Sequence, residues 1–274
     1  MQDNPLITLT TDFGYEDPFV GVMKGVILKI NPRAEIIDLT HGITPQDIRG
    51  AAFAIGTSYT FFPDDTIHIV VVDPGVGSGR RPIIVSMGHH YFIGPDNGVF
   101  SYIYRAGQET PEVVHITAEY YFLSNRSPTF QARDVFCSVA AWLSRGVALS
   151  KFGDTITDYH KIELPFASVS RDGILRGEVI HIDRFGNAIT NITKADVERL
   201  FCSEFAPCKI MLKGREIPFK RFYLEADNGK LCSLLNSSDF LEFFLYAGNA
   251  AAECNITVGD AVEIVLPSVN EVKP

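Results

Sequence analysis

The sequence predicts an α/β fold in two parts, an N-terminal domain with a parallel sheet and a small antiparallel β-barrel domain after it. In the first part, β-branched runs alternate with helical stripes in units of about 30 residues, which is typical of parallel strands joined by right-handed crossovers. In the second part, short strands and turns replace the helices. The helical pattern is absent from about residue 151 to residue 173, which suggests a linker between domains at residues 1–160 and 172–274.

The first predicted strand ends beside an acid, Asp12, and is followed by a helix. Residues 6–10 form a β-prone run that stops beside Asp12. Asp17 followed by Pro18 is typical of a helix N-cap and first helical residue, and Asn31 before a proline ends the helix. A second strand follows at residues 35–39. The apolar residues at helical spacing are Phe19, Val22, Met23, Val26, Ile27 and Ile30.

A second acid stands at the end of the next strand. Thr44-Pro45 opens a helix that extends to about Thr60, and a turn then leads into a strand that stops at Asp73. Pro74 bars continuation of this strand, and the glycines after it favour a turn. The carboxyl ends of parallel strands meet at one edge of a sheet, where ligands bind. We therefore expect Asp12 and Asp73 at the same edge, although a solvated turn acid is the plain alternative for Asp73.

The remaining elements follow from shorter patterns. In the first domain, strands are expected at residues 82–85, 90–93 and 113–116, with a turn at 94–98, an apolar aromatic segment at 99–104, and a helix that follows residues 127–134 and is closed by Gly146. In the second domain, strands are expected at residues 177–183, 188–192, 208–212, 216–219, 231–235, 240–245 and 261–265, with a helical turn at 194–201 opened by Thr193.

The composition excludes several classes of function. A net charge of -9 and the absence of a Lys/Arg run argue against a nucleic-acid partner and favour a cationic ligand. The 5 cysteines include no C-x-x-C pair and no zinc spacing, which indicates reduced thiols in the cytoplasm and no metal site. Acids near the N-terminus and the lack of a long apolar run indicate a soluble protein with no signal peptide and no membrane span.

Seven motifs follow one another along nearly the whole chain. They are TTDFG at 10–14, HGITPQD at 41–47, VVVDPGVGSGRR at 70–81, GPDNG at 94–98, PTFQARD at 128–134, IDRFGNAITNI at 182–192, and NSSDFLEF with GNAA at 236–251. Together they resemble the S-adenosyl-L-methionine (SAM) hydrolase (adenosine-forming) family, also called SAM hydroxide adenosyltransferases, which is related to the SAM-dependent fluorinases and chlorinases.

The resemblance implies an α/β domain followed by a β-barrel, and a homotrimer that holds SAM between the first domain of one subunit and the second domain of its neighbour. The implied reaction is hydrolysis of SAM to adenosine and L-methionine by in-line attack of water or hydroxide on ribose C5′. SAM is the substrate, and no separate cofactor is implied. Because the leaving group is a neutral thioether, the reaction needs an oriented, desolvated water and no general acid.

By the resemblance, three positions correspond to an Asp-Arg-His set that positions and activates the water. Asp73 and Arg80 match the first two members, with Arg81 as the rival arginine and a solvated turn residue as the plain alternative for Arg80. A carboxylate can accept the water's hydrogen bond, and a guanidinium can fix that carboxylate. Gln131 stands where the family has His; its amide can orient water but cannot take a proton. Gln131 could also be only a polar residue at a helix start.

Other positions match the substrate-binding residues of the family. Asp12 matches the acid that receives the ribose hydroxyls, and Asp17 matches a second acid near the ribose unless it is only an N-cap. In the second domain, Asp183, Phe185 and Asn187 match contacts to methionine and adenine, Ser237 and Glu242 match the methionine end, and Asn249 and Ala250 match backbone contacts to adenine. Asn187 could equally be a turn residue, and Glu242 a surface strand residue.

Three alternatives remain open from the sequence. Gln131 suggests a non-catalytic SAM or adenosine sensor, which would bind without turnover. A SAM-dependent halogenase is disfavoured because Asp73 would repel a halide by several kcal/mol in a poorly solvated pocket, about the Coulomb energy at modest dielectric. A phosphate-binding loop at residues 75–81 is weaker still, because the G-x-x-x-x-G-K-[ST] pattern is absent.

Overall fold

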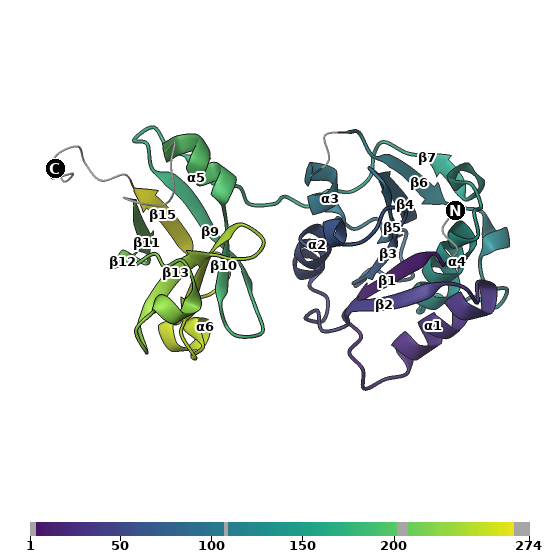
Figure 1. Ribbon diagram of the computed structural model, residues 1–274. Helices are drawn as coiled ribbons and strands as arrows, with labels where there is room; N and C mark the ends of the chain where they lie inside the picture. The colour runs from purple at the N-terminus through teal and green to yellow at the C-terminus, as the bar shows by residue number, and fades with distance from the viewer. Residues whose placement is uncertain (1–3, 107–108, 202–207, 266–274) are drawn as a thin grey trace. The chain divides into compact units, whose positions relative to one another are not determined.

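The computed structural model describes residues 4–106, 109–201 and 208–265. The chain divides into two compact units, Met1–Leu164 and Pro165–Pro274, and each contains one sheet (Figure 1). The first sheet is flanked by helices and the second is antiparallel, so the predicted α/β fold with a barrel-like second part is confirmed.

The first unit is built on a 7-stranded sheet with the strand order β2-β1-β3-β5-β4-β6-β7. The strands β2, β1 and β3 pair in parallel, as predicted, and β5 joins β3 in parallel as well. The strands β4, β6 and β7 extend the sheet in antiparallel pairing. Thr11 pairs with Val71, so Asp12 and Asp73 follow their strands at the same edge. The bounds are β1 Leu6–Thr11, β2 Glu35–Thr40, β3 Ile67–Val71, β4 Pro82–Met87, β5 His90–Pro95, β6 Glu112–Ile116 and β7 Gly153–Thr155.

Helices cover both faces of this sheet (Figure 1). The helices α1 (Phe19–Ile30) and α4 (Ser138–Ser144) pack on one face, against Ile69 and Val71 among others. The helices α2 (Ile48–Gly56) and α3 (Ser101–Ala106) pack on the other face, which receives Val70. Because successive side chains of a strand point to opposite faces, β3 contributes to both cores.

The helix α4 carries the single tryptophan of the chain, Trp142, whose ring meets Tyr121 edge-on at a centroid distance of 6.0 Å. It continues directly from the π-helix η3 (Ala132–Cys137). The described residues also form short 3₁₀ helices: η1 Tyr59–Phe61, η2 Glu119–Tyr121, η4 Leu149–Lys151 and η5 Tyr223–Glu225.

Two helices begin later than the sequence pattern predicts. The helix α2 begins at Ile48 because Gln46 has a left-handed backbone (φ 69°) and because Asp47 caps the helix, accepting a hydrogen bond from Gly50 N at 2.9 Å. The helix α1 has Pro18 in the N-cap position and no side-chain cap hydrogen bond, so the predicted cap by Asp17 is wrong.

The second unit is an antiparallel sheet with the order β12-β11-β15-β9-β10-β14-β13, and β8 pairs with β9. A bridge between Phe219 and Ser233 connects the segment after β12 to β13, so the two edge strands meet and the sheet is nearly closed. The interior is apolar, with Val179, Phe243 and Ile264 fully buried. The strand bounds are β8 Ser168–Val169, β9 Leu175–Ile182, β10 Ala188–Thr193, β11 Lys209–Leu212, β12 Arg215–Ile217, β13 Leu231–Leu235, β14 Phe240–Leu245 and β15 Ala261–Val265.

Two helices complete the second unit, α5 (Lys194–Phe201) and α6 (Ala250–Cys254). The predicted cap of α5 is confirmed, because the Thr193 hydroxyl accepts a hydrogen bond from Asp196 N while the Asp196 carboxylate accepts one from Thr193 N. Within the described parts of the chain, every helix is too short or too polar to cross a lipid bilayer.

Candidate functional site

The candidate site is a pocket of about 420 Å³ at the carboxyl edge of β1 and β3. Asp12, Asp73 and Gln131 all line it, so three of the residues singled out in the sequence share one pocket. Asp17 is exposed and lies outside the pocket lining.

Asp73 and Arg80 form a buried ion pair beside this pocket. Nε of Arg80 donates to both carboxylate oxygens of Asp73 at 2.9 Å, and its Nη2 donates to Oδ2. The two side chains are only 4% and 9% exposed, respectively. The guanidinium also lies over the Phe136 ring, 5.4 Å from its centroid. Its Nη1 is buried and has no hydrogen-bond partner among the described residues.

Arg81 is held away from Asp73 by other acids. Its guanidinium donates to Asp96 at 2.7 and 2.9 Å and to the Asp158 carboxylate at 2.8 Å. The hydrogen bond to Asp158 and the nearby Asp96 carboxylate raise the pKa of Arg81. Of the two candidate arginines, Arg80 is therefore the one paired with Asp73.

The turn between Asp73 and Arg80 touches the segment that carries Gln131. Gly77 has a left-handed backbone (φ 80°), and a Cβ atom there would lie 2.9 Å from the carbonyl oxygen of Pro128. Only glycine fits this conformation and this approach at low cost.

Gln131 occupies the N-cap position of η3 but forms no side-chain cap hydrogen bond. The segment before it is anchored by Asp134, which is fully buried and accepts a hydrogen bond from Ser127 N at 2.7 Å. Gln131 thus lines the pocket at the end of a segment that a buried acid anchors.

The pocket also has an aromatic wall. Phe13, Phe19 and Phe130 line the pocket, with ring centroids 5.3 to 6.2 Å apart. Asp12 lies next to this wall, and its Oδ2 accepts a hydrogen bond from Gln46 N at 2.7 Å. Carboxylates beside aromatic rings suit a ligand that combines a positive charge, hydroxyl groups and a flat ring.

The second unit gathers most of its predicted residues around one turn. Asp183 folds the turn between β9 and β10, because its carboxylate accepts hydrogen bonds from the backbone N of Phe185 and Asn187 at 2.9 and 2.8 Å. Asn249 lies against this turn, since a Cβ atom at Gly186 would be 2.1 Å from its Oδ1. Asn249 also caps α6 by accepting from Ala252 N at 2.8 Å.

The ring of Phe185 is 76% exposed on this turn, whereas Ala250 is fully buried, backbone included. Asn187 is both a turn residue and nearly buried, with its Nδ2 donating to Asp183 at 3.0 Å. Its side chain is therefore already committed to the fold of the turn.

Glu242 is a buried acid and not a surface residue, with 3% exposure. It accepts hydrogen bonds from the Tyr223 hydroxyl at 2.9 Å and from Asn236 Nδ2 at 3.2 Å. Burial raises the pKa of the Glu242 carboxyl, and these two hydrogen bonds only partly oppose the effect. Ser237 is exposed in the turn that follows Asn236.

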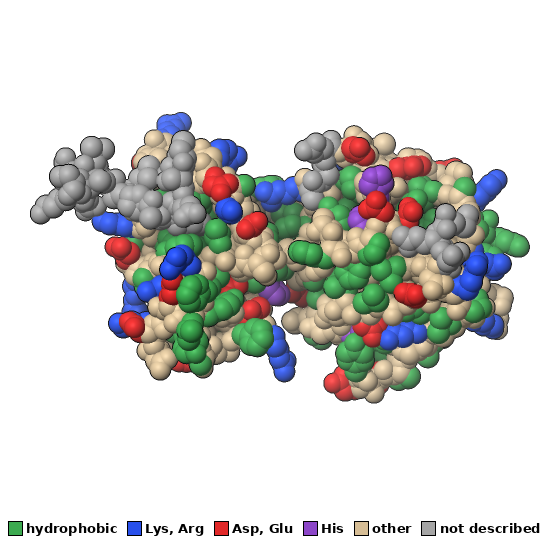
Figure 2. Space-filling view, in the orientation of Figure 1, with side chains coloured by type: hydrophobic (Ala, Val, Ile, Leu, Met, Phe, Trp, Pro, Cys, Tyr) green, Lys and Arg blue, Asp and Glu red, His purple; other side chains and the backbone are tan. Residues whose placement is uncertain are grey.

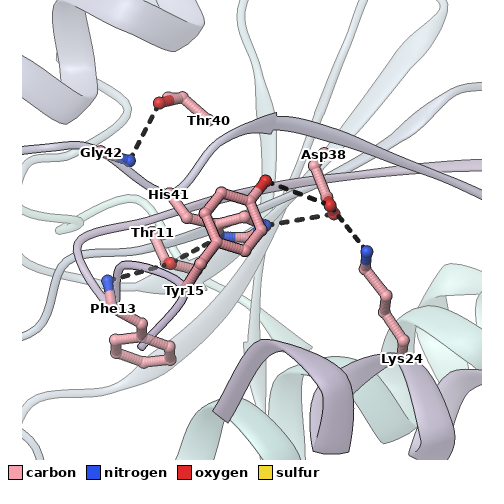
Figure 3. Close-up of polar contacts among 8 residues, drawn as sticks. All are labelled: Thr11, Phe13, Tyr15, Lys24, Asp38, Thr40, His41 and Gly42. Atoms are coloured by element: carbon pink, nitrogen blue, oxygen red, sulfur yellow. Dashed lines mark hydrogen bonds and ion pairs between the residues drawn. The ribbon is translucent and has the colours of Figure 1, made fainter. Parts of the chain in front are cut away.

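Sequence reasoning missed two groups of residues. Tyr223 gave no signal, because it lies outside the strands and meets Glu242 only in the folded chain. Asn236 opens the NSSDFLEF motif, but the motif did not reveal its contact with Glu242. The group behind Asp12, which includes Thr11, Asp38 and His41, is drawn in Figure 3. The HGITPQD motif could have indicated this group, because its histidine, His41, follows Asp38 by three residues at the end of a predicted strand.

The charges of the surface are mixed. On the faces shown in Figure 2, Lys and Arg side chains lie among Asp and Glu side chains and form no continuous basic surface of the described residues. Among the side chains that the structure places, no group of three or more His, Cys, Asp or Glu is arranged to hold a metal ion.

Comparison with known proteins finds relatives of both units of the chain. Residues 7–153 match the SAM hydroxide adenosyltransferase N-terminal domain, and residues 177–263 match the C-terminal domain of the same family. A protein of Thermotoga maritima, described only as an uncharacterized conserved protein, has a solved structure that is similar with a TM-score of 0.86 and 33% identity, over 95% of this chain and 100% of the other.

Curated relatives carry more specific names. The (R)-S-adenosyl-L-methionine hydrolase of Methanocaldococcus jannaschii is 35% identical over 95% of both chains. The protein of the same name from Thermus thermophilus is 32% identical over 93% of this chain and 97% of its own. A fluorinase of an Actinoplanes species is more distant, with 25% identity over 95% of this chain and 97% of its own. The chain therefore belongs to the SAM hydroxide adenosyltransferase family.

Proposed function

We propose that this protein is an enzyme that hydrolyses SAM to adenosine and L-methionine. The observation that carries the proposal is the buried Asp73–Arg80 pair at a pocket that also contains Asp12 and Gln131. The names of the relatives at 30 to 35% identity support the same reaction.

In the proposed reaction, water attacks ribose C5′ in line with the departing sulfur. The C5′–O bond forms as the C5′–S bond breaks, and the electron pair of that bond leaves with sulfur, so the sulfonium becomes the neutral thioether of methionine. Asp73 accepts the proton of the water, and Arg80 holds the carboxylate in one orientation through its paired hydrogen bonds. The amide of Gln131, which lines the same pocket, orients the water. The displacement needs no cofactor and no metal ion.

Asp12 binds the ribose hydroxyls in this proposal. Its hydrogen bond from Gln46 N fixes the carboxylate, and the remaining lone pairs can accept two neighbouring hydroxyl groups. Asp17, which is exposed and outside the pocket lining, is the weaker candidate for a ribose contact.

The second unit supplies the rest of the binding surface in our proposal. The exposed ring of Phe185 stacks on adenine, with Asn187 beside it, while the backbone of Asn249 reads the adenine edge. Ala250, which is fully buried, is the weaker candidate for this contact. Asp183, Ser237 and Glu242 bind the methionine end of SAM.

Since neither unit alone contains both sets of residues, we propose a homotrimer that brings the second unit of one subunit to the pocket of its neighbour. The four cysteines that the structure describes are free thiols, which suits the proposed cytoplasmic location.

One observation favours a second candidate, a SAM or adenosine sensor. Gln131 lines the pocket where the family has a histidine, and an amide cannot take a proton. A halogenase finds no such support, because the Asp73 carboxylate lines the pocket that a halide would have to enter.

The test is to incubate the protein with SAM in ¹⁸O-labelled water and to follow adenosine and methionine by chromatography and mass spectrometry. We expect equal amounts of both products, with the label in the 5′-hydroxyl of adenosine. Asp73→Asn should lower kcat by a factor of about 100 or more, because a general base contributes that much. Asp158→Asn, which alters an exposed acid bound to Arg81, is the matched control and should leave kcat within about twofold.

Two outcomes would contradict the proposal. Tight SAM binding without adenosine, together with turnover by Gln131→His, would identify a binding protein on a hydrolase scaffold. Label-free adenosine would exclude attack of water at C5′.

A further inference from the structure

A series of polar contacts connects α1 with the loop that joins β1 to α1 (Figure 3). It runs from Lys24 Nζ to Asp38 Oδ2 (2.6 Å), from Asp38 Oδ1 to His41 Nε2 (3.1 Å), from His41 Nδ1 to the Thr11 hydroxyl (2.8 Å), and from that hydroxyl to Phe13 N (3.2 Å). The series therefore connects a charged residue of α1 with the backbone next to Asp12.

The contacts of this series fix the direction of each hydrogen bond. The side chain of His41 is fully buried, and neither its Nε2 nor Asp38 Oδ1 has a hydrogen-bond partner among the described residues other than the facing atom. These two atoms face each other at ion-pair distance, away from the line of an ideal hydrogen bond. A proton on Nε2 is the arrangement that satisfies both of them, and Nδ1 then accepts from the hydroxyl of Thr11.

Asp38, the acid in this series of contacts, remains charged. Partial burial alone would raise the pKa of the Asp38 carboxyl, but hydrogen bonds from Lys24 and His41 hold that pKa below its ordinary value. Asp38 is therefore a carboxylate that holds the imidazole in one tautomer and one orientation.

The same histidine anchors the loop on the far side of Asp12. The carbonyl oxygen of His41 accepts a hydrogen bond from Gly14 N at 2.9 Å. The ring of Tyr15 meets the imidazole edge-on at 5.0 Å, and its hydroxyl donates to Asp38 at 3.3 Å. Residues on both sides of Asp12 are thus tied to one buried side chain and its acid.

We propose that His41 is a positioning residue that acts through Thr11 to aim the Asp12 carboxylate and the Phe13 ring into the pocket. This inference rests on the proposed role of Asp12 at the ribose hydroxyls. A loop held in its bound conformation before the ligand arrives loses less conformational entropy on binding, so the contribution of His41 appears as affinity for the hydroxyl groups.

A second buried Thr–His pair in the same sheet serves as a control, because it lies outside the pocket. Three residues earlier on the same strand, the Thr8 hydroxyl lies 2.8 Å from Nδ1 of another fully buried histidine, His68. Neither Thr8 nor His68 lines the pocket. The two Thr–His pairs match in distance and burial, and only the pair of Thr11 and His41 lies next to Asp12.

The experiment compares Thr11→Val with Thr8→Val, since each change removes one hydroxyl and keeps the side-chain shape. Calorimetry measures the dissociation constants for adenosine and for 2′,3′-dideoxyadenosine, which lacks both ribose hydroxyls, and turnover of SAM is measured separately. In the wild type, adenosine should bind more tightly than the dideoxy compound. We expect Thr11→Val to weaken adenosine binding about tenfold with little effect on the dideoxy compound, and to raise KM for SAM with kcat changed less than about threefold.

Thr8→Val should lower the melting temperature as much as Thr11→Val and leave the ratio of the two dissociation constants unchanged. Thr11→Ser, which restores the hydroxyl, should recover the wild-type ratio. An unchanged ratio in Thr11→Val, or an equal change in both valine variants, would overturn the inference and leave His41 with a structural role alone. Absence of turnover in the wild type would instead contradict the proposed function, because the ratio of binding constants is measured without turnover.

Discussion

At the scale of single residues, partners decide the role of similar side chains. Arg80 and Arg81 are neighbours in the sequence, yet one holds the pocket acid Asp73 and the other joins Asp96 to Asp158. The family resemblance favoured Arg80 for this role and left Arg81 as its rival. The orientation of the turn after Asp73 separates them, and a sequence pattern carries little information about that orientation.

A buried histidine outside the site has a predictable effect on stability. His68 is fully buried, and burial lowers its pKa to about 3 from the ordinary 6.5, with the nearby His90 adding to the effect. Between pH 6.5 and about pH 3, the unfolded chain therefore binds a proton at this residue, whereas the folded chain does not. We expect the free energy of unfolding to be unaffected by His68 above pH 6.5 and to fall by up to about 1.4 kcal/mol for each unit below it.

Chemical denaturation at pH 7, 6 and 5, at one fixed subunit concentration, measures this slope. His68→Gln should flatten the slope between pH 6.5 and 5, because glutamine takes up no proton in either state. His89→Gln changes an exposed neighbour of His90 and should leave the slope as it is in the wild type. A slope that persists in His68→Gln would assign the pH dependence to other groups.

At the scale of elements, the site depends on where strands and helices end. The β-branched runs and their terminal acids were predictable, because alternation, Pro and Gly act locally. The late start of α2 was not predictable, since it depends on the left-handed backbone of Gln46, whose N–H is then directed at Asp12. The contact between Glu242 and Tyr223 joins residues 19 positions apart, one of them in a short 3₁₀ helix, and no periodic pattern reports it.

The contribution of the Asp47 cap of α2 should be measurable in the free energy of unfolding. Asp47→Ala removes the acceptor of the hydrogen bond from Gly50 N, and we expect a loss of about 1 kcal/mol in the free energy of unfolding. Asp47→Asn should recover most of this loss, because its side-chain oxygen can accept the same hydrogen bond.

Asp17→Ala is the comparison for this prediction, since Asp17 precedes α1 without capping it. Its effect on the free energy of unfolding should stay within about 0.5 kcal/mol. Equal losses in Asp17→Ala and Asp47→Ala would show that general charge effects near helix starts, and not the cap, account for the change.

At the scale of the whole molecule, the proposed trimer makes each site depend on two subunits. Asp73→Asn damages the first unit, and Phe185→Ala removes an exposed ring from the second unit. In trimers assembled at random from equal amounts of both variants, about one site in four combines an intact first unit with an intact second unit. We therefore expect co-expression to restore about a quarter of wild-type turnover, although each variant alone is nearly inactive.

Turnover of tagged, co-purified mixtures measures this recovery, with each variant expressed alone as the reference. Activity no higher than the average of the two separate variants would mean that each site is formed within one subunit. Sedimentation of the same samples would show whether the mixed particles are trimers.

The place of Trp142 has a spectroscopic consequence. It is the single indole in the sequence and lies on α4 of the first unit, in contact with Tyr121 and outside the pocket lining. Its emission therefore follows the melting of the α/β unit, while the barrel contributes only tyrosine signals. A fluorescence melting curve that precedes or trails the far-ultraviolet circular dichroism curve would reveal two units that unfold in separate steps.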